Sequence, residues 1–151
     1  MRRAILAALL AMLPAAAHAE DVGSVGYRFQ WFGPNDKITI EAIDDPDIPG
    51  ITCYISRART GGIKGAFGLA EDPPYASISC HQVAPIDADK VEKIKSPQEV
   101  FSERASLIFK TTQVVRFFDA KRRALVYLTY TDRIIEGSPQ NSISVVPLGF
   151  R

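Results

Sequence analysis

The stretch LIFKTTQVVRFF-DAKRR-ALVYLTYT, residues 107–131, decides the fold class of this sequence. Residues 107–118 and 124–131 are rich in Val, Ile, Phe, Tyr and Thr, the residue types that favour β-strands. Residues 119–123 begin with Asp, which favours the first position of a type I turn, and continue with basic residues that stay hydrated. The stretch therefore predicts a hairpin of two long strands.

The segments on either side of this hairpin extend the prediction. Gly137, Ser138 and Pro139 predict another turn, and residues 142–146 predict a last strand, so that a three-stranded meander closes the chain. Before the hairpin, the run Ser-Pro-Gln-Glu at 96–99 has a capping residue, proline at the first helical position and Glu three residues after the cap. This pattern predicts a short helix over residues 97–105.

Nearer the N-terminus, residues 37–43 alternate with period two and predict a half-buried strand. One face would carry Ile38, Ile40 and Ala42, and the other Lys37, Thr39, Glu41 and Ile43. The Asp- and Pro-rich run 44–50 predicts a turn, in which Asp side chains accept from turn amides. Residues 51–56 resume the β pattern and complete a wide hairpin, and residues 76–83 predict a further strand.

The distribution of Gly and Pro agrees with these elements. Six of each fall between residues 33 and 85, and none between 100 and 136, so short strands with tight loops precede longer elements. No linker or repeat divides the chain. We expect a single β-rich domain over residues 20–151, mainly antiparallel and sandwich- or barrel-like, with one or two short helices; an α+β fold is the alternative.

Residues 1–19 have the features of a cleaved signal peptide: Arg2 and Arg3, a short apolar run, and the small-x-small sequence Ala-His-Ala at 17–19. Export to the periplasm is therefore expected, with secretion as the alternative, and no membrane span remains after cleavage. With 18 basic and 17 acidic residues, the chain lacks the charge that nucleic-acid binding requires.

The only two cysteines, Cys53 and Cys80, lie in the predicted mature chain. An exported protein meets an oxidising compartment, so this even count predicts one disulfide; two buried free thiols are the alternative. The predicted mature chain has one histidine, His81. Two cysteines and one histidine are a poor set of zinc ligands, and we expect no metal and no cofactor.

Several runs of the sequence resemble the CreA family of exported bacterial proteins, and the resemblance extends over nearly the whole mature chain. It implies export and a compact small domain, but it brings no enzymatic activity that can be assigned to residues here. The runs that carry it are DDPD at 44–47, TCY at 52–54, TGGIKG at 60–65, GLAED at 68–72, ISC at 78–80, VAPI at 83–86, VVRFFDAKR at 114–122 and EGSP at 136–139.

A glycine-rich loop is the first candidate site. Glycines let backbone N–H groups turn toward one point, and neighbouring cations attract an anion. The competing interpretation is a structural loop that uses glycine for positive φ. The residues of this candidate anion or ligand site are Arg57, Arg59, Gly61, Gly62, Lys64 and Gly65.

Other candidates are weaker. The acidic turn at Asp44, Asp45 and Asp47 offers too few oxygens for calcium, so turn chemistry is favoured. No G-x-S-x-G elbow accompanies His81, which alternation with Cys80 turns toward solvent. The alternating Tyr27, Phe29 and Trp31 are expected to pack in the core or across strands; in the alternative, Trp31 and Phe32 line a groove.

These observations favour a non-enzymatic exported domain with no catalytic residue, which binds an unidentified periplasmic protein or a small anionic ligand. A small envelope enzyme is the alternative. A deep pocket with convergent polar groups and a shifted pKa would favour an enzyme, whereas an apolar or charged surface patch would favour a binding module.

Overall fold

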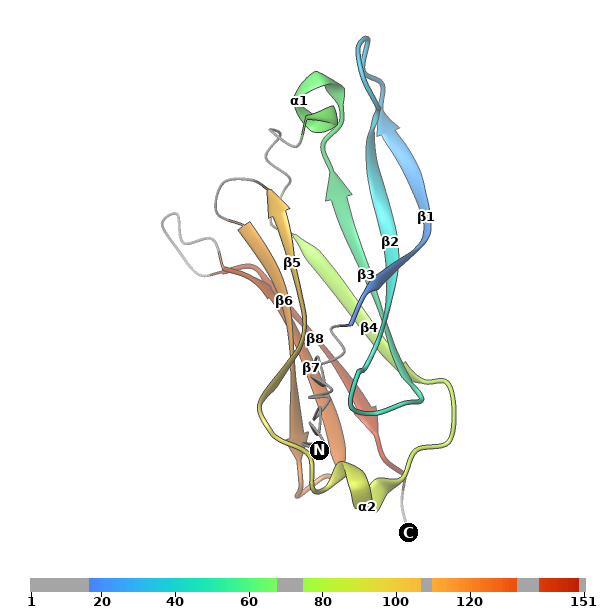
Figure 1. Cartoon of the computed structure of the whole chain (residues 1–151), viewed down its shortest axis with the longest axis vertical. Helices are drawn as coiled ribbons and strands as arrows, with labels where there is room; N and C mark the ends of the chain where they lie inside the picture. Colours follow the sequence, from blue (N-terminus) through green and yellow to red (C-terminus); the bar gives the residue numbers. More distant parts are fainter. Residues whose placement is uncertain (1–16, 68–74, 107–109, 133–138, 150–151) are drawn as a thin grey trace, which may run out of the picture.

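The computed structural model describes residues 17–67, 75–106, 110–132 and 139–149. Within them, eight strands form two antiparallel four-stranded sheets, and each sheet is a meander in which every strand pairs with the next (Figure 1). The first sheet contains β1 (Ala19–Arg28), β2 (Asp36–Asp44), β3 (Ile51–Arg59) and β4 (Ala76–Gln82). The second contains β5 (Gln98–Ser106), β6 (Lys110–Asp119), β7 (Ala124–Thr131) and β8 (Asn141–Pro147). The predicted antiparallel, sandwich-like, β-rich fold is thus confirmed.

The β6–β7 hairpin forms where the sequence predicts it. Asp119 pairs with Ala124 at the end of the ladder, and its Oδ1 accepts from the amide of Arg122 at 3.1 Å, as expected of Asp at the start of a turn. β8 then pairs with β7 and completes the closing meander. The turn predicted at 137–139 lies outside the described residues except for Pro139, and the predicted signal peptide lies outside them up to residue 16.

The hairpin of β2 and β3 is also confirmed, but its buried face is the more polar one. Side chains alternate along β2 as predicted, with Thr39 and Ile43 buried. Ile38 and Ile40 lie on the opposite face and are exposed. The first sheet therefore presents polar groups to the second sheet along part of its inner surface.

The helix predicted over residues 97–105 is wrong, because these residues form β5. Val100 and Phe101 are buried in the core, and Phe101 pairs with Val114 in the ladder with β6. A helix cap contributes about 1 kcal/mol, whereas burying each of these side chains contributes about 1.5–3 kcal/mol. Tertiary packing therefore overrides the local capping signal.

Two short helices are present at other positions. α1 (Gly62–Ala66) lies within the glycine-rich segment, and α2 (Ala88–Val91) precedes β5. The side chain of Asp87 caps α2 by accepting from the amides of Asp89 and Lys90. In the described part of the chain, no helix is long and apolar enough to cross a membrane.

The two sheets approach most closely where β4 faces β7 and β8 (Figure 1). The amide of Cys80 in β4 donates to the Ser144 hydroxyl in β8 at 2.8 Å, so a side chain of one sheet satisfies an edge amide of the other. Cys53 and Cys80 are register partners on β3 and β4, and their sulfurs are bonded, as predicted. The buried core is formed by Ile43, Ile48, Ile51, Cys53, Ile55, Ile78, Cys80, Val91, Val100, Phe101, Val114, Leu125, Tyr127 and Val146.

The prediction that the N-terminal aromatic residues pack in the core is wrong. Tyr27, Phe29 and Trp31 are all exposed, as is Phe32. Phe29 and Trp31 contact each other edge to face, with ring centroids 5.6 Å apart. They lie at and beyond the end of β1, past the region where the second sheet covers the first.

Candidate functional site

Between the sheets, the apolar core surrounds the buried Asp45–Arg116 pair, whereas farther along the strands the buried side chains are mainly polar. From the first sheet, Thr39 and Arg57 are buried in the polar part. From the second sheet, Thr112, Thr129 and Thr131 are buried, and Thr129 and Thr131 follow the core residue Tyr127 along the same face of β7. The sandwich thus encloses a set of hydrogen-bonding groups that packing alone does not explain.

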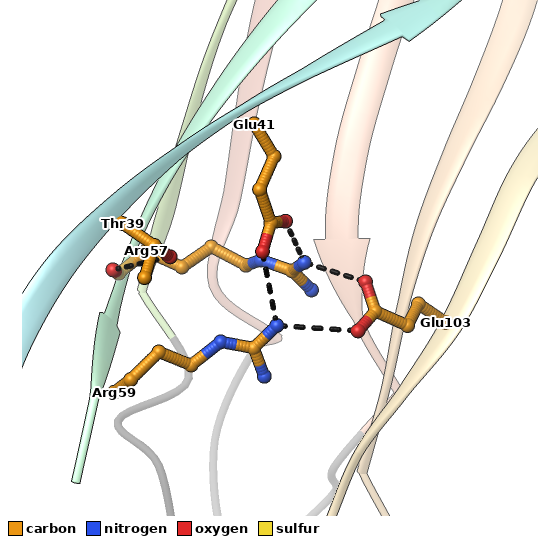
Figure 2. A network of polar contacts seen from close by, with 5 residues as sticks. All are labelled: Thr39, Glu41, Arg57, Arg59 and Glu103. Atoms are coloured by element: carbon orange, nitrogen blue, oxygen red, sulfur yellow. Dashed lines mark hydrogen bonds and ion pairs between the residues drawn. The ribbon is translucent and has the colours of Figure 1, made fainter. Parts of the chain in front are cut away.

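Four charged side chains form a closed ring across this polar part (Figure 2). Nη2 of Arg57 contacts Oε2 of Glu41, and it lies 2.5 Å from Oε2 of Glu103. Nη2 of Arg59 lies 3.3 Å from Oε1 of Glu41 and 3.2 Å from Oε1 of Glu103. Each arginine therefore bridges two carboxylates, and Glu103 of β5 links the second sheet to β3 of the first.

The ring keeps Glu103 and Arg59 charged despite their partial burial. Burial alone would raise the pKa of Glu103, but hydrogen bonds and positive charge from Arg57 and Arg59 outweigh it and lower that pKa. Burial would likewise lower the pKa of Arg59, but Glu103 and Glu41 hold it above its ordinary value. Glu103 is the most exposed member, with 37% of its side chain accessible, whereas Arg57 is only 5% accessible.

Three members of the ring, Glu41, Arg59 and Glu103, line a cleft of about 530 Å³ formed by residues of β1, β2, β3 and β5. This volume falls in the range of small-molecule sites, about 300–1,000 Å³. Both signs of charge line it, so it offers donors and acceptors close together. Its lining residues are Ala17, His18, Ala19, Asp21, Lys37, Thr39, Glu41, Arg59, Phe101, Ser102 and Glu103.

Beside the cleft, Arg57 has hydrogen-bond donors that no described residue accepts. Its Nε and Nη1 are buried and have no hydrogen-bond partner among the residues that the structure describes, and the same is true of Oγ1 of Thr129. A buried guanidinium normally has its donors satisfied, because each unmade bond costs about 1–3 kcal/mol. These donors suit an acceptor brought in from outside the chain.

Because of the ring, the free energy of unfolding should depend on pH through the ionisation of Glu103. A carboxyl whose pKa is lowered by folding contributes stability above its ordinary value, 4.5 here, and loses that contribution as the pH falls through the folded value. We expect Glu103→Gln to be less stable than the wild type near neutrality, with the difference shrinking as the pH falls from about 6 to about 3. Urea unfolding at several pH values measures it, and a difference that stays constant with pH would contradict the assignment.

The structure separates the residues of the predicted anion loop. Arg57 and Arg59 lie in the ring, whereas Lys64 is exposed on α1. The amide of Gly61 donates to Oδ1 of Asp36, that of Gly62 to the carbonyl oxygen of Pro34, and that of Gly65 to the carbonyl oxygen of Gly61. The glycine amides therefore bind groups of the chain itself and do not converge with Arg57 and Arg59.

In the acidic turn, Asp45 accepts hydrogen bonds from turn amides, as the sequence predicts, and also contacts the buried Arg116. Oδ1 of Asp45 accepts from the amides of Asp47 and Ile48. The same oxygen lies 2.5 Å from Nη1 of Arg116, and Oδ2 accepts from the Tyr127 hydroxyl at 2.7 Å. Among the described residues, no group of three or more His, Cys, Asp or Glu side chains could hold a metal ion.

Sequence reasoning missed the carboxylates of the ring. Glu41 stands in the correctly predicted alternation of β2, but Glu103 falls in the segment predicted as helix. His81, by contrast, is exposed as expected and contacts the Ser79 hydroxyl through Nε2 at 2.7 Å, on the outer face of the first sheet. It lies on the face opposite the cleft.

Comparison with known proteins finds relatives over nearly the full length. A family model described as CreA protein matches residues 22–150. The chain is 56% identical over 146 residues to Protein CreA from Escherichia coli strain K12, strain CFT073 and O157:H7, covering 95% of this chain and 93% of each relative. No solved structure matches it significantly.

Proposed function

The chain belongs to the CreA family, and we propose that it is an exported, non-enzymatic domain that binds a small anionic ligand between its two sheets. The observation that carries the proposal is the ring of Arg57, Glu41, Arg59 and Glu103, of which all but Arg57 line a cleft of about 530 Å³. The anionic group of the ligand takes the place of the Glu103 carboxylate at the two arginines.

Several features support this exchange. Glu103 is the most exposed member of the ring and the only one supplied by the second sheet. An incoming carboxylate or phosphate would bring the acceptors that arginine binds best. The donors Nε and Nη1 of Arg57, beside the cleft, have no partner in the described part of the chain and could bind a further acceptor of the ligand.

The electrostatics favour binding over proton transfer. General acid–base catalysis works best when the catalytic group has a pKa near the working pH. The arginines instead move the pKa of Glu103 downward, away from neutrality. For this reason we favour a binding domain over the alternative, a small envelope enzyme.

Export is part of the proposal and rests on the N-terminal sequence. Residues 1–19 have the order of a signal peptide, and cleavage after Ala19 would place the protein in the periplasm. Ala17, His18 and Ala19 line the cleft, so cleavage would remove three of its lining residues and leave Glu41, Arg59 and Glu103 in place. Intact mass of the exported protein tests this step, and a mass that retains residues 1–19 would contradict it.

Ligand binding is tested by calorimetric titration with citrate, phosphate, sulfate and glucuronate. We expect at least one of these anions to bind, and Glu103→Gln to tighten its binding about tenfold because a competing like charge is removed. Arg59→Met should abolish binding. His81→Gln, on the outer face of the first sheet, is the control and should bind like the wild type. Failure of all four anions to bind both the wild type and Glu103→Gln would refute the proposal.

A further inference from the structure

An apolar tip lies at the end of the first sheet, beyond the cleft. It consists of residues 28–36, which include the connection from β1 to β2, and residues 61–67, which contain α1; both lie at one end of the long axis of the molecule (Figure 1). Trp31 is 86% exposed there and is the most exposed large hydrophobic side chain described. The exposed apolar side chains of the tip are Phe29, Trp31, Phe32, Ile63 and Phe67.

Close backbone contacts between the two segments of the tip keep these side chains on its surface. The amide of Gly62 donates to the carbonyl oxygen of Pro34 at 2.6 Å, and the amide of Gly61 donates to Oδ1 of Asp36 at 2.8 Å. Gly33 has a φ of +85°, and a Cβ added to it would lie 2.5 Å from the carbonyl carbon of Gly62. The two segments are thus packed backbone to backbone, which leaves no room for the aromatic rings between them.

The charge of the tip is positive. Residues 28–36 and 61–67 contain two cations, Arg28 and Lys64, and one carboxylate, Asp36, whose Oδ2 lies 3.9 Å from Nε of Arg28. Asp36 is buried and accepts from the Gly61 amide and from Nε2 of Gln30. Arg28 and Lys64 are exposed, so apolar rings and cationic groups share this end of the molecule.

From this arrangement we propose that the tip docks on an anionic lipid surface, with Trp31 and its neighbouring phenylalanines at the boundary between headgroups and acyl chains. Aromatic side chains favour this boundary, and basic side chains beside them bind lipid phosphates. A lipid surface receives a projecting apolar tip without a complementary groove. The inference is independent of the ligand proposed for the cleft.

The single tryptophan of the chain makes the test direct, because Trp31 is itself in the tip. The chain is mixed with phosphatidylcholine vesicles with and without phosphatidylglycerol, and sedimentation and tryptophan emission are recorded. We expect sedimentation with the anionic vesicles only, a shift of emission to shorter wavelength, and quenching by brominated acyl chains. Added salt should weaken the binding.

Variants identify the surface. Phe32→Ser keeps the probe and should lower the vesicle partition coefficient about tenfold, and Arg28→Glu with Lys64→Glu should abolish the preference for anionic vesicles. Ile143→Ser, which removes an equally apolar exposed side chain from the outer face of the second sheet, is the control. All chains compared carry the same N-terminus, so any contribution of residues 1–19 cancels.

Three results would overturn the inference. One is an emission spectrum that anionic vesicles leave unchanged. Another is an equal loss of vesicle binding in Ile143→Ser and Phe32→Ser. The third is self-association in sedimentation velocity that Phe32→Ser removes while vesicles leave Trp31 unaffected, which would assign the tip to a protein contact.

Discussion

Replacing Asp45 by alanine should lower the free energy of unfolding by about 3–5 kcal/mol, the cost of removing one partner from a buried ion pair. Asp45 is fully buried, and Arg116 is 1% exposed. Burial would lower the pKa of Arg116, but Asp45 and then Asp47 raise it, so the guanidinium stays charged inside the sandwich. Without Asp45, it faces the core with Asp47 as its remaining ion-pair partner among the described residues.

Graded variants keep this prediction testable if Asp45→Ala does not fold. Asp45→Asn retains an oxygen for the turn amides of Asp47 and Ile48 but removes the charge and the oxygen that accepts from Tyr127, so its cost is compared with that of Tyr127→Phe to separate the ion pair from this hydrogen bond. Asp47→Ala should cost about 1 kcal/mol or less, because nearly half of the Asp47 side chain is exposed. Tyr127→Phe should cost about 1–2 kcal/mol through the lost hydrogen bond to Asp45. Urea unfolding provides the values, and a cost for Asp45→Ala no larger than that for Asp47→Ala would contradict this account.

Loss of the disulfide should have the second largest effect. The bridge joins residues 27 apart in sequence, and closing a loop of that length stabilises the folded state by about 3–4 kcal/mol in the chain-entropy treatment. We expect Cys53→Ala combined with Cys80→Ala to lose this amount in denaturant unfolding. The two alanines leave the strands in register but remove the covalent link between β3 and β4.

Reduction provides the matching control. Dithiothreitol should lower the denaturation midpoint of the wild type toward that of the double variant and should leave the double variant unchanged. If the wild-type midpoint did not respond to complete reduction, the bridge would contribute nothing to stability.

Much of the fold was predictable because its strands are joined by turns with clear local chemistry. Asp119 begins the β6–β7 turn, and Asp45 organises the β2–β3 turn through its own following amides. Strongly alternating or β-branched runs on either side of each turn leave few other pairings. Residues 98–106 were misassigned, because their helix-start signal is local whereas their partners in β6 and in the core are distant.

The candidate site was predictable only in part. The sequence predicts Arg57 and Arg59 as site residues because they are cations beside glycines, but their contacts are set by tertiary structure. Glu103 lies 46 residues from Arg57 in sequence, so no local spacing brings the two together. The strand that delivers Glu103 was itself predicted as helix, and that single error concealed the ring. The glycine amides, in turn, hold the tip together.

Amide chemical-shift mapping tests the central claim, that the cleft between the sheets is a binding site. Spectra of the chain and of its Glu103→Gln variant are recorded during titration with citrate and phosphate. We predict saturable shifts at the amides of Glu41, Arg59 and Ser102, reached at lower anion concentration in Glu103→Gln, with Ile143 and His81 unchanged. Shifts confined to residues outside the cleft, or a Glu103→Gln variant that binds more weakly than the wild type, would contradict the account.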